Sequence, residues 1–166
     1  SDLDAVRELV FTAFGPVEGP VIAQLISDLL LDPSAAPCLS LVATIDRDIV
    51  GHVLFTHAEV RQPGRVVAAA ILAPLAVHPT VRSKGIGGQL IMAGLESMAD
   101  RRVELVFVLG HPDYYPRHGF QPAGVLGFEA PHPIPIEHAN AWMVQAFRPD
   151  IVGAVSGAVS CAAALR

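Results

Sequence analysis

The sequence predicts a single α/β domain over residues 1–166, with a central mixed, mostly antiparallel sheet flanked by helices. Two helical patterns come first, hairpin strands follow, and a strand–helix–strand unit precedes a late antiparallel pair of strands, an order typical of mixed-sheet α/β folds. Hydrophobic residues make up 52% of the chain and charged residues 16%. A chain of this length and composition folds around one core, and no internal repeat or linker divides it.

Composition also narrows the class of protein. The formal net charge is −5 and no basic stripe is present, which argues against a nucleic-acid binder. The longest apolar stretch, 66–77, is interrupted by Pro74 and is shorter than the roughly 20 residues of a membrane-spanning helix. Ser1 begins no signal-peptide pattern, so we expect a soluble, cytoplasmic protein with no membrane partner. Cys38 and Cys161 form neither a disulfide framework nor a zinc pattern, and we expect no metal.

Periodicity and turn residues give the expected elements. Asp2 or Asp4 would cap a first helix that ends at Gly15-Pro16. The segment from Phe128 to His138 is rich in proline and is expected to be a loop. The remaining elements are a second helix over about 18–31, strands over 39–45, 49–57, 66–77, 103–109, 141–147 and about 155–161, and a central helix ending near residue 100.

The central feature is the turn where the strand ending at Val77 gives way to the central helix. The residues expected to bind a phosphate or pyrophosphate there are Arg82, Ser83, Lys84, Gly85, Ile86, Gly87 and Gly88. A helix N-terminus carries unpaired N–H groups and partial positive charge, and glycines let an anion approach closely. The dinucleotide fingerprint fails because Leu90 holds its last glycine position, and the P-loop pattern fails because Lys84 precedes the glycines.

Two motifs resemble the GNAT superfamily of acyl-CoA N-acetyltransferases. Arg82-x-x-Gly85-x-Gly87 resembles its pyrophosphate-binding signature, and Tyr115-x-x-x-Gly119-Phe120 resembles the segment after its fifth strand. Both occur in the right order, separated by a helix and a strand, which is more specific than either alone. The resemblance covers nearly the whole chain and is closest to a bacterial branch with unassigned substrates. Family members usually begin with a strand before the first helix, and we expect that N-terminal strand to be absent here.

The resemblance implies a fold with splayed strands and acetyl-CoA as co-substrate. In the family, the fourth and fifth strands separate and pantetheine pairs with the fourth strand as an added strand would. Leu75, Ala76 and Val77 occupy that position here. Pro74 lacks an N–H, so a continuous ladder cannot run through it, and we expect a bulge or splay there.

The resemblance also implies a reaction and a catalytic residue. An amine attacks the thioester carbonyl directly within a ternary complex, and a backbone N–H near Val77 stabilises the oxyanion. Tyr115 would protonate the departing thiolate, whereas its neighbour Tyr114 would pack in the core. The general base stays open among four side chains: His57, Glu59, His78 and Asp113.

The sequence therefore predicts an N-acetyltransferase that moves an acetyl group from acetyl-CoA to a primary amine. The acceptor would be a small molecule or a protein N-terminus or Lys, bound between the first two helices and the loop after Phe128. A homodimer is compatible with the sequence. The alternatives are a non-catalytic acyl-CoA-binding or regulatory module and a nucleotide-binding protein, which would bind ATP or NAD in place of CoA.

Overall fold

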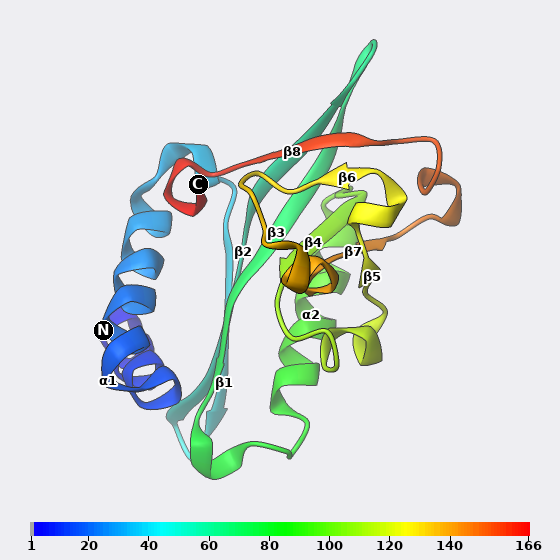
Figure 1. Ribbon diagram of the computed structural model, residues 1–166. Coiled ribbons are helices and arrows are strands. Elements are labelled where there is room, and N and C mark those ends of the chain that lie inside the picture. The colour runs from blue at the N-terminus through cyan, green and yellow to red at the C-terminus, as the bar shows by residue number, and fades with distance from the viewer. Residues whose placement is uncertain (1) are drawn as a thin grey trace.

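A computed structural model describes residues 2–166 (Figure 1). The two helices are α1 (Asp2–Leu31) and α2 (Ile86–Asp100). The strands are β1 (Leu39–Ile45), β2 (Asp48–Gln62), β3 (Arg65–Val77), β4 (Leu105–Leu109), β5 (Gln121–Pro122), β6 (Phe128–Glu129), β7 (Trp142–Ala146) and β8 (Gly157–Cys161). Short 3₁₀ turns occupy Pro33–Ala35, Pro79–Val81, Tyr115–His118, Gly124–Leu126, Ile136–Ala141, Pro149–Ile151 and Ala163–Leu165.

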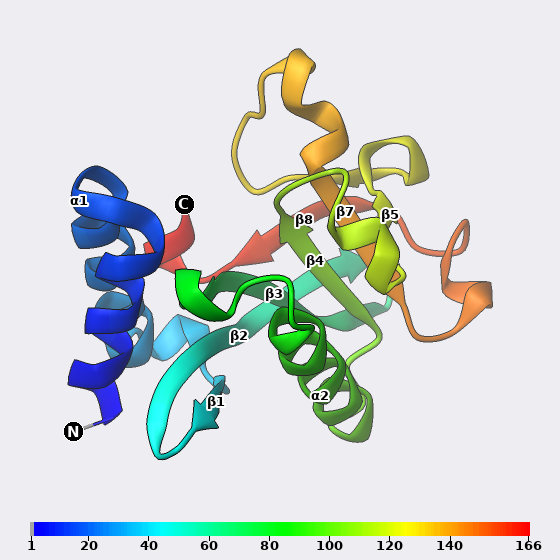
Figure 2. The same ribbon diagram turned by 90° about the horizontal axis from the view of Figure 1, so that it is seen from below.

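The strands form a mixed sheet in the order β5-β7-β4-β3-β2-β8-β6, with β1 also paired to β2. The β3–β4 and β6–β8 pairs are parallel and the others are antiparallel. Helix α2 covers one face, where Ile91 and Leu95 pack with Phe55. Helix α1 covers part of the other face, as Figure 2 shows. The predicted fold class is confirmed.

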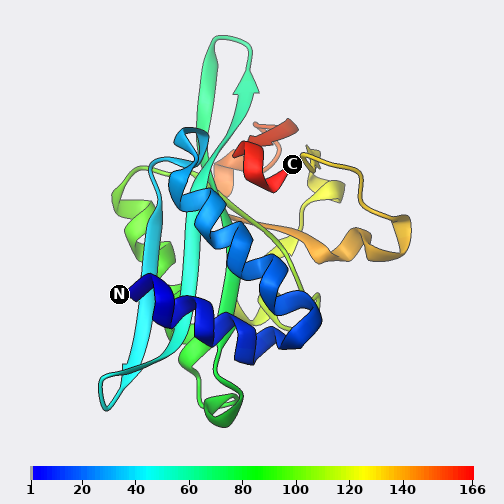
Figure 3. The same ribbon diagram turned by 90° about the vertical axis from the view of Figure 1, so that its left-hand side faces the viewer.

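Helix α1 is broken in the middle. Gly15 has φ 84° and ψ −178°, and Pro16 and Pro20 follow it. Its two limbs meet at an angle in Figure 3, so the prediction of two helices separated at Gly15-Pro16 is confirmed. Asp2 and Asp4 lie in the first turn, where their carboxylates favour the helix dipole; the start of this helix adjoins a residue outside the described ones, so the capping prediction stays a prediction.

By length and composition alone, α1 could cross a membrane. Its position in the fold accounts for part of that composition, since 28% of its most apolar window is buried. The buried side chains of its two limbs pack over the end of β3, where they meet Ala76; they include Val6, Leu9, Val10, Ala23 and Ile26. An apolar helix pair pressed on a sheet needs such residues on its inner face.

Strands β3 and β4 separate part-way along their length. Their pairing covers three positions and ends where Ile71 faces Phe107. The β2–β3 register shifts between Val53 and Phe55, opposite Ala73 and Pro74. The bulge or splay predicted from Pro74 is therefore confirmed. Within residues 2–166, no strand pairs with the end of β3 on the edge that faces β4.

Two features of the sheet differ from the expectation. The last two strands are not a pair: β7 lies beside β4, and β8 crosses to β2, where Cys161 faces Ala58. β7 covers the edge that β4 would otherwise expose, and β8 extends the sheet beyond the end of β1. The loop predicted from Phe128 begins with a two-residue strand instead, because the buried Phe128 ring packs edge-on to Phe107.

Candidate active site

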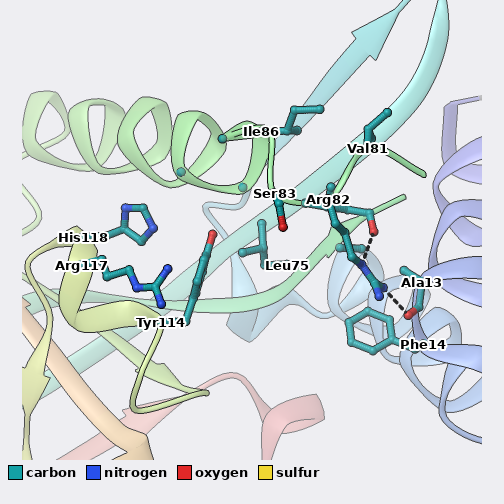
Figure 4. Close-up of a pocket in the computed structure, with 15 residues that line it drawn as sticks. Ala13, Phe14, Leu75, Val81, Arg82, Ser83, Ile86, Tyr114, Arg117 and His118 are labelled. Atoms are coloured by element: carbon teal, nitrogen blue, oxygen red, sulfur yellow. Dashed lines mark hydrogen bonds between the residues drawn. The ribbon is translucent and has the colours of Figure 1, made fainter. Parts of the chain in front are cut away.

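A cavity of about 590 Å³ opens between the end of β3, the N-terminus of α2 and the turn that begins at Tyr114 (Figure 4). Nine of the ten predicted cofactor-binding residues line it: Leu75, Ala76, Val77, Arg82, Ser83, Gly85, Ile86, Gly87 and Gly88. Lys84 is exposed and lies outside the lining. The remaining walls come from segments that the motif did not include: Ala13 and Phe14 of α1, Val81, Tyr114, Arg117 and His118. Segments far apart in the chain thus close one cavity.

The floor of this cavity at α2 is built from backbone. Gly85, in the left-handed conformation with φ 81°, precedes the helix. The first intrahelical bond runs from the Gln89 N–H to the Gly85 carbonyl at 3.0 Å. The N–H groups of residues 86–88 therefore precede the helical ladder, where a helix presents donors and partial positive charge.

Two glycines in this turn are required by close contacts. A Cβ on Gly87 would lie 2.5 Å from the Tyr114 hydroxyl, and one on Gly88 would lie 2.9 Å from the His118 ring. Neither position admits a side chain without movement of its neighbour. The glycines therefore have two effects. They let the turn at Tyr114 approach the helix N-terminus closely, and they leave the amides of that N-terminus uncovered.

The other wall is the end of β3. Leu75, Ala76 and Val77 pair with Val53, His52 and Gly51 of β2 on one side. Within the part of the chain that the structure describes, β4 has already turned away on the other side. In an antiparallel ladder, alternate residues direct their N–H and C=O groups away from the partner, so this edge can pair with an extended ligand.

Arg82 holds two parts of the cavity wall together. Its Nη2 donates to the Ala13 carbonyl at 2.7 Å, and its Nε donates to the Val77 carbonyl at 3.3 Å (Figure 4). Ala13 lies just before the break in α1, so the guanidinium ties the first limb of α1 to the end of β3. The sequence pattern treated Arg82 and Lys84 as equivalent charges, and the structure separates them.

The two tyrosines are placed opposite to the expectation. Tyr115 is 8% exposed and packs edge-on to the rings of Tyr114 and Phe120. Its ring fills the space over Gly110, where a Cβ would overlap it. Tyr115 does not line the cavity, whereas Tyr114 does and directs its hydroxyl toward Gly87. The motif spacing selects Tyr115, but the contact with Gly110 turns its ring into the core.

Both phenols are protonated at neutral pH, as any phenol is, and burial raises their pKa values further. It raises the pKa of Tyr115, and the neighbouring Tyr114 raises it further. Burial also raises the pKa of Tyr114, although the Arg117 guanidinium opposes that shift. The His118 pKa is lowered by burial and by Arg117. Tyr114 is thus a neutral proton donor in a cavity that is also lined by two cationic side chains, Arg82 and Arg117.

The four side chains considered as a general base lie away from this cavity. His57 lies 3.5 Å from the Glu59 carboxylate, which also pairs with Arg61. His78 accepts the Thr80 N–H through Nδ1 at 3.2 Å. None of them, nor the exposed Asp113, belongs to the cavity lining. The general base therefore stays unassigned.

A buried histidine lies on β2, next to the end of β3. His52 faces Ala76 across the β2–β3 pair, and its Nε2 lies 2.8 Å from the Ser40 hydroxyl. Burial lowers the pKa of His52 to about 4, so the ring is neutral at pH 7. It lies beside β3 on the paired strand β2 and does not line the cavity.

Comparison with known proteins identifies the family. Residues 1–123 match the family described as acetyltransferase (GNAT) domain. The chain is also 44% identical to the uncharacterized N-acetyltransferase YjhQ of Escherichia coli K12, over 98% of this chain and 88% of YjhQ. The protein belongs to the GNAT family. Members of this family are acyl-CoA-dependent N-acetyltransferases, and this chain is one of them.

Solved GNAT structures agree over the whole fold. The crystal structure of Escherichia coli YhbS in complex with CoA matches with a TM-score of 0.86 and 29% identity, covering 99% of this chain and 86% of YhbS. A GNAT family acetyltransferase from Brucella melitensis in complex with acetyl-CoA matches with a TM-score of 0.76 and 27% identity, covering 99% and 92% of the two chains. The co-substrate of this GNAT protein is accordingly acetyl-CoA or a related acyl-CoA.

Proposed function

We propose that this GNAT protein transfers the acetyl group of acetyl-CoA to a primary amine by direct attack within a ternary complex. The observation that carries the proposal is the single cavity that joins the open edge of β3, the N-terminus of α2 and the Tyr114 hydroxyl. A thioester donor needs an anion site, an extended channel and a proton donor, and this cavity has each of them.

The cavity suggests how acetyl-CoA binds. Its pyrophosphate would accept hydrogen bonds from the N–H groups of residues 86–88, helped by the α2 dipole and by Arg117, which lines the same cavity. Its pantetheine would pair with Leu75–Val77 as an added strand. This assigns six of the ten predicted cofactor-binding residues to direct contact: Leu75, Ala76, Val77, Ile86, Gly87 and Gly88.

The chemistry follows from the same placement. The acceptor nitrogen attacks the thioester carbon and loses a proton to a base or to water. A backbone N–H of the Leu75–Val77 segment stabilises the oxyanion. When the C–S bond breaks, the sulfur takes a proton that comes from the Tyr114 hydroxyl by way of water, because that hydroxyl lies at Gly87, at the pyrophosphate end of the cavity.

The test is thiol release from acetyl-CoA by the full chain across a library of amines, with calorimetry to follow binding. We expect acetyl-CoA to bind and CoA to be released at a rate that depends on the amine. Binding without amine-dependent release would instead support the non-catalytic acyl-CoA-binding module. Preferential binding of ATP or NAD would contradict both.

A further inference from the structure

We infer that the acceptor is a monoamine with an apolar, uncharged body, and that this body binds in a second cavity between the end of β4 and the proline-rich segment 130–141. This inference rests on the proposed function, because it names the substrate class for the same reaction. The second cavity has a volume of about 580 Å³. Its apolar wall is formed by Leu109, Pro112, Pro133, Ile134, Pro135 and Ala141.

The second cavity lies beside the place where the strands separate. The β3–β4 pairing ends at Ile71 and Phe107, so Leu109 stands level with Ala73, two residues past the last pair. Leu109 is 47% exposed although β4 is an interior strand. An apolar side chain left open at the separation of two strands is a wall for a ligand that reaches between them.

The second cavity reaches the separation from the face opposite α2, whereas the cofactor cavity takes lining residues from both α1 and α2. Phe107 packs in the cluster with Phe128 and Trp142, away from α2, whereas Val106 and Val108 pack with α2. Successive side chains of a strand alternate between faces, so Leu109 shares the face of Phe107. An amine in the second cavity would therefore meet the thioester from the side opposite α2.

The charges around the second cavity exclude a polycation. The titratable side chains in its lining are three imidazoles, His111, His132 and His138, and the lining that the structure describes contains no Asp, Glu, Lys or Arg. Glu129 belongs to the adjoining cavity on the other side of the segment. A second ammonium in the acceptor would lose its hydration here without gaining a carboxylate, which is unfavourable.

The wall is fixed in place before any ligand arrives. The Gly110 N–H donates to the Ala141 carbonyl at 2.9 Å, and the His138 N–H donates to the Pro135 carbonyl at 2.8 Å. Three prolines, at 131, 133 and 135, restrict the backbone that leads into the bonded stretch. A preformed apolar wall favours a rigid aryl or alkyl body because little ordering is needed on binding.

The experiment compares kcat/KM of the full chain for phenethylamine and hexylamine with that for spermidine and kanamycin. We expect the monoamines to be preferred by about 10-fold or more, the range in which apolar pockets discriminate. Leu109→Asp should lower kcat/KM for phenethylamine by about 10-fold and narrow the preference over spermidine, with acetyl-CoA affinity unchanged. Leu109→Asn, which is polar but neutral, should lower kcat/KM for phenethylamine without raising kcat/KM for spermidine.

The matched control is Ile136→Asp. Ile136 is 90% exposed in the same segment and outside the cavity lining, so this variant should keep the parental preference. A parental preference for spermidine or kanamycin, or parental kinetics in Leu109→Asp, would overturn the inference while leaving the proposed function intact.

Calorimetry with phenethylamine in the presence of CoA distinguishes failure of the proposed function from failure of this inference. If no amine releases CoA but phenethylamine binds the parent and not Leu109→Asp, the proposed function fails and the apolar cavity stands. If phenethylamine neither binds nor reacts, the inference fails whatever other amine is accepted.

Discussion

The cofactor cavity and the cavity beside β4 are built from different parts of the chain. The cofactor cavity relies on backbone: the amides at the start of α2, two close-packed glycines and the open edge of β3. The cavity beside β4 relies on apolar side chains and prolines. Backbone groups recognise what every acyl-CoA shares, whereas side chains select among acceptors. Substitutions should therefore abolish binding in the first cavity and change selectivity in the second.

The strongest test of this comparison is Gly87→Glu. A carboxylate at this position faces the expected pyrophosphate, and its side chain displaces the Tyr114 hydroxyl, which lies 2.5 Å from the Cβ position. Like charges in contact cost several kcal/mol, and each 1.4 kcal/mol is tenfold, so acetyl-CoA affinity should fall by about 100-fold or more. Calorimetry with acetyl-CoA measures it, and circular dichroism checks the fold.

Gln89→Glu is the matched control for this variant. Gln89 is exposed in the same first turn of α2 and does not line the cavity, so the added charge should cost little affinity. Gly87→Ala separates bulk from charge, because it moves Tyr114 without adding a carboxylate. Unchanged affinity in a folded Gly87→Glu protein would place the co-substrate elsewhere.

Much of the fold could be predicted because its signals are local. Gly15-Pro16 marks the break in α1, Asp46-Arg47-Asp48 marks the hairpin turn, and Pro74 marks the irregularity in β3. The partners of the last two strands could not be read in this way. β7 and β8 are both strands of five residues, and which edge each one covers depends on the separation of β3 and β4 and on the length of β2.

The candidate site likewise has parts with a local sequence signal and parts that depend on long-range contacts. The turn from Arg82 to Gly88 could be recognised because a backbone-built anion site needs glycine at fixed positions in one short segment. The contact of Arg82 with Ala13 spans 69 positions and leaves no local pattern. The choice between Tyr114 and Tyr115 depends on Gly87, which makes room for the Tyr114 hydroxyl, and on Gly110, which makes room for the Tyr115 ring. Apolar walls such as Leu109 look like any core residue in the sequence.

Substitutions of the two tyrosines test which hydroxyl supplies the proton to the leaving thiolate. Tyr114→Phe keeps the ring and removes the hydroxyl that lies at the cavity, so kcat should fall by about 100-fold, towards the lower part of the general-acid range, because a thiolate is a fair leaving group. Tyr115→Phe should change kcat little, since its ring contacts are retained. Turnover is measured at saturating acetyl-CoA with an accepted amine.

The pH profile sharpens this test. A general acid works only while protonated, and burial raises the pKa of Tyr114 above its ordinary value of 10.0. The activity of the parent enzyme should therefore fall only above about pH 10, and this high-pH fall should be absent in Tyr114→Phe. If Tyr115→Phe slows turnover and Tyr114→Phe does not, the motif spacing identifies the acid correctly. If neither slows, thiolate departure needs no tyrosine.

The smallest effects come from charges around the backbone-built cavity. Arg82 lines the cavity and Lys84 does not, so Arg82→Gln should weaken acetyl-CoA binding by up to about fivefold and Lys84→Gln by less, the range for exposed ion pairs. Such charges are screened over about 8 Å at physiological ionic strength. Titrations at low and high salt should thus show a flatter salt dependence for Arg82→Gln.

Arg82→Lys separates charge from geometry. It keeps the positive charge, but an ammonium cannot reproduce the planar fork that reaches both the Ala13 and Val77 carbonyls. We expect this variant to keep the parental salt slope and to lose the attachment of α1 to β3, which hydrogen exchange at residues 2–14 would report as faster exchange. If Lys84→Gln costs as much as Arg82→Gln and flattens the salt slope equally, long-range charge dominates, and side-chain position in the cofactor cavity matters less than its backbone.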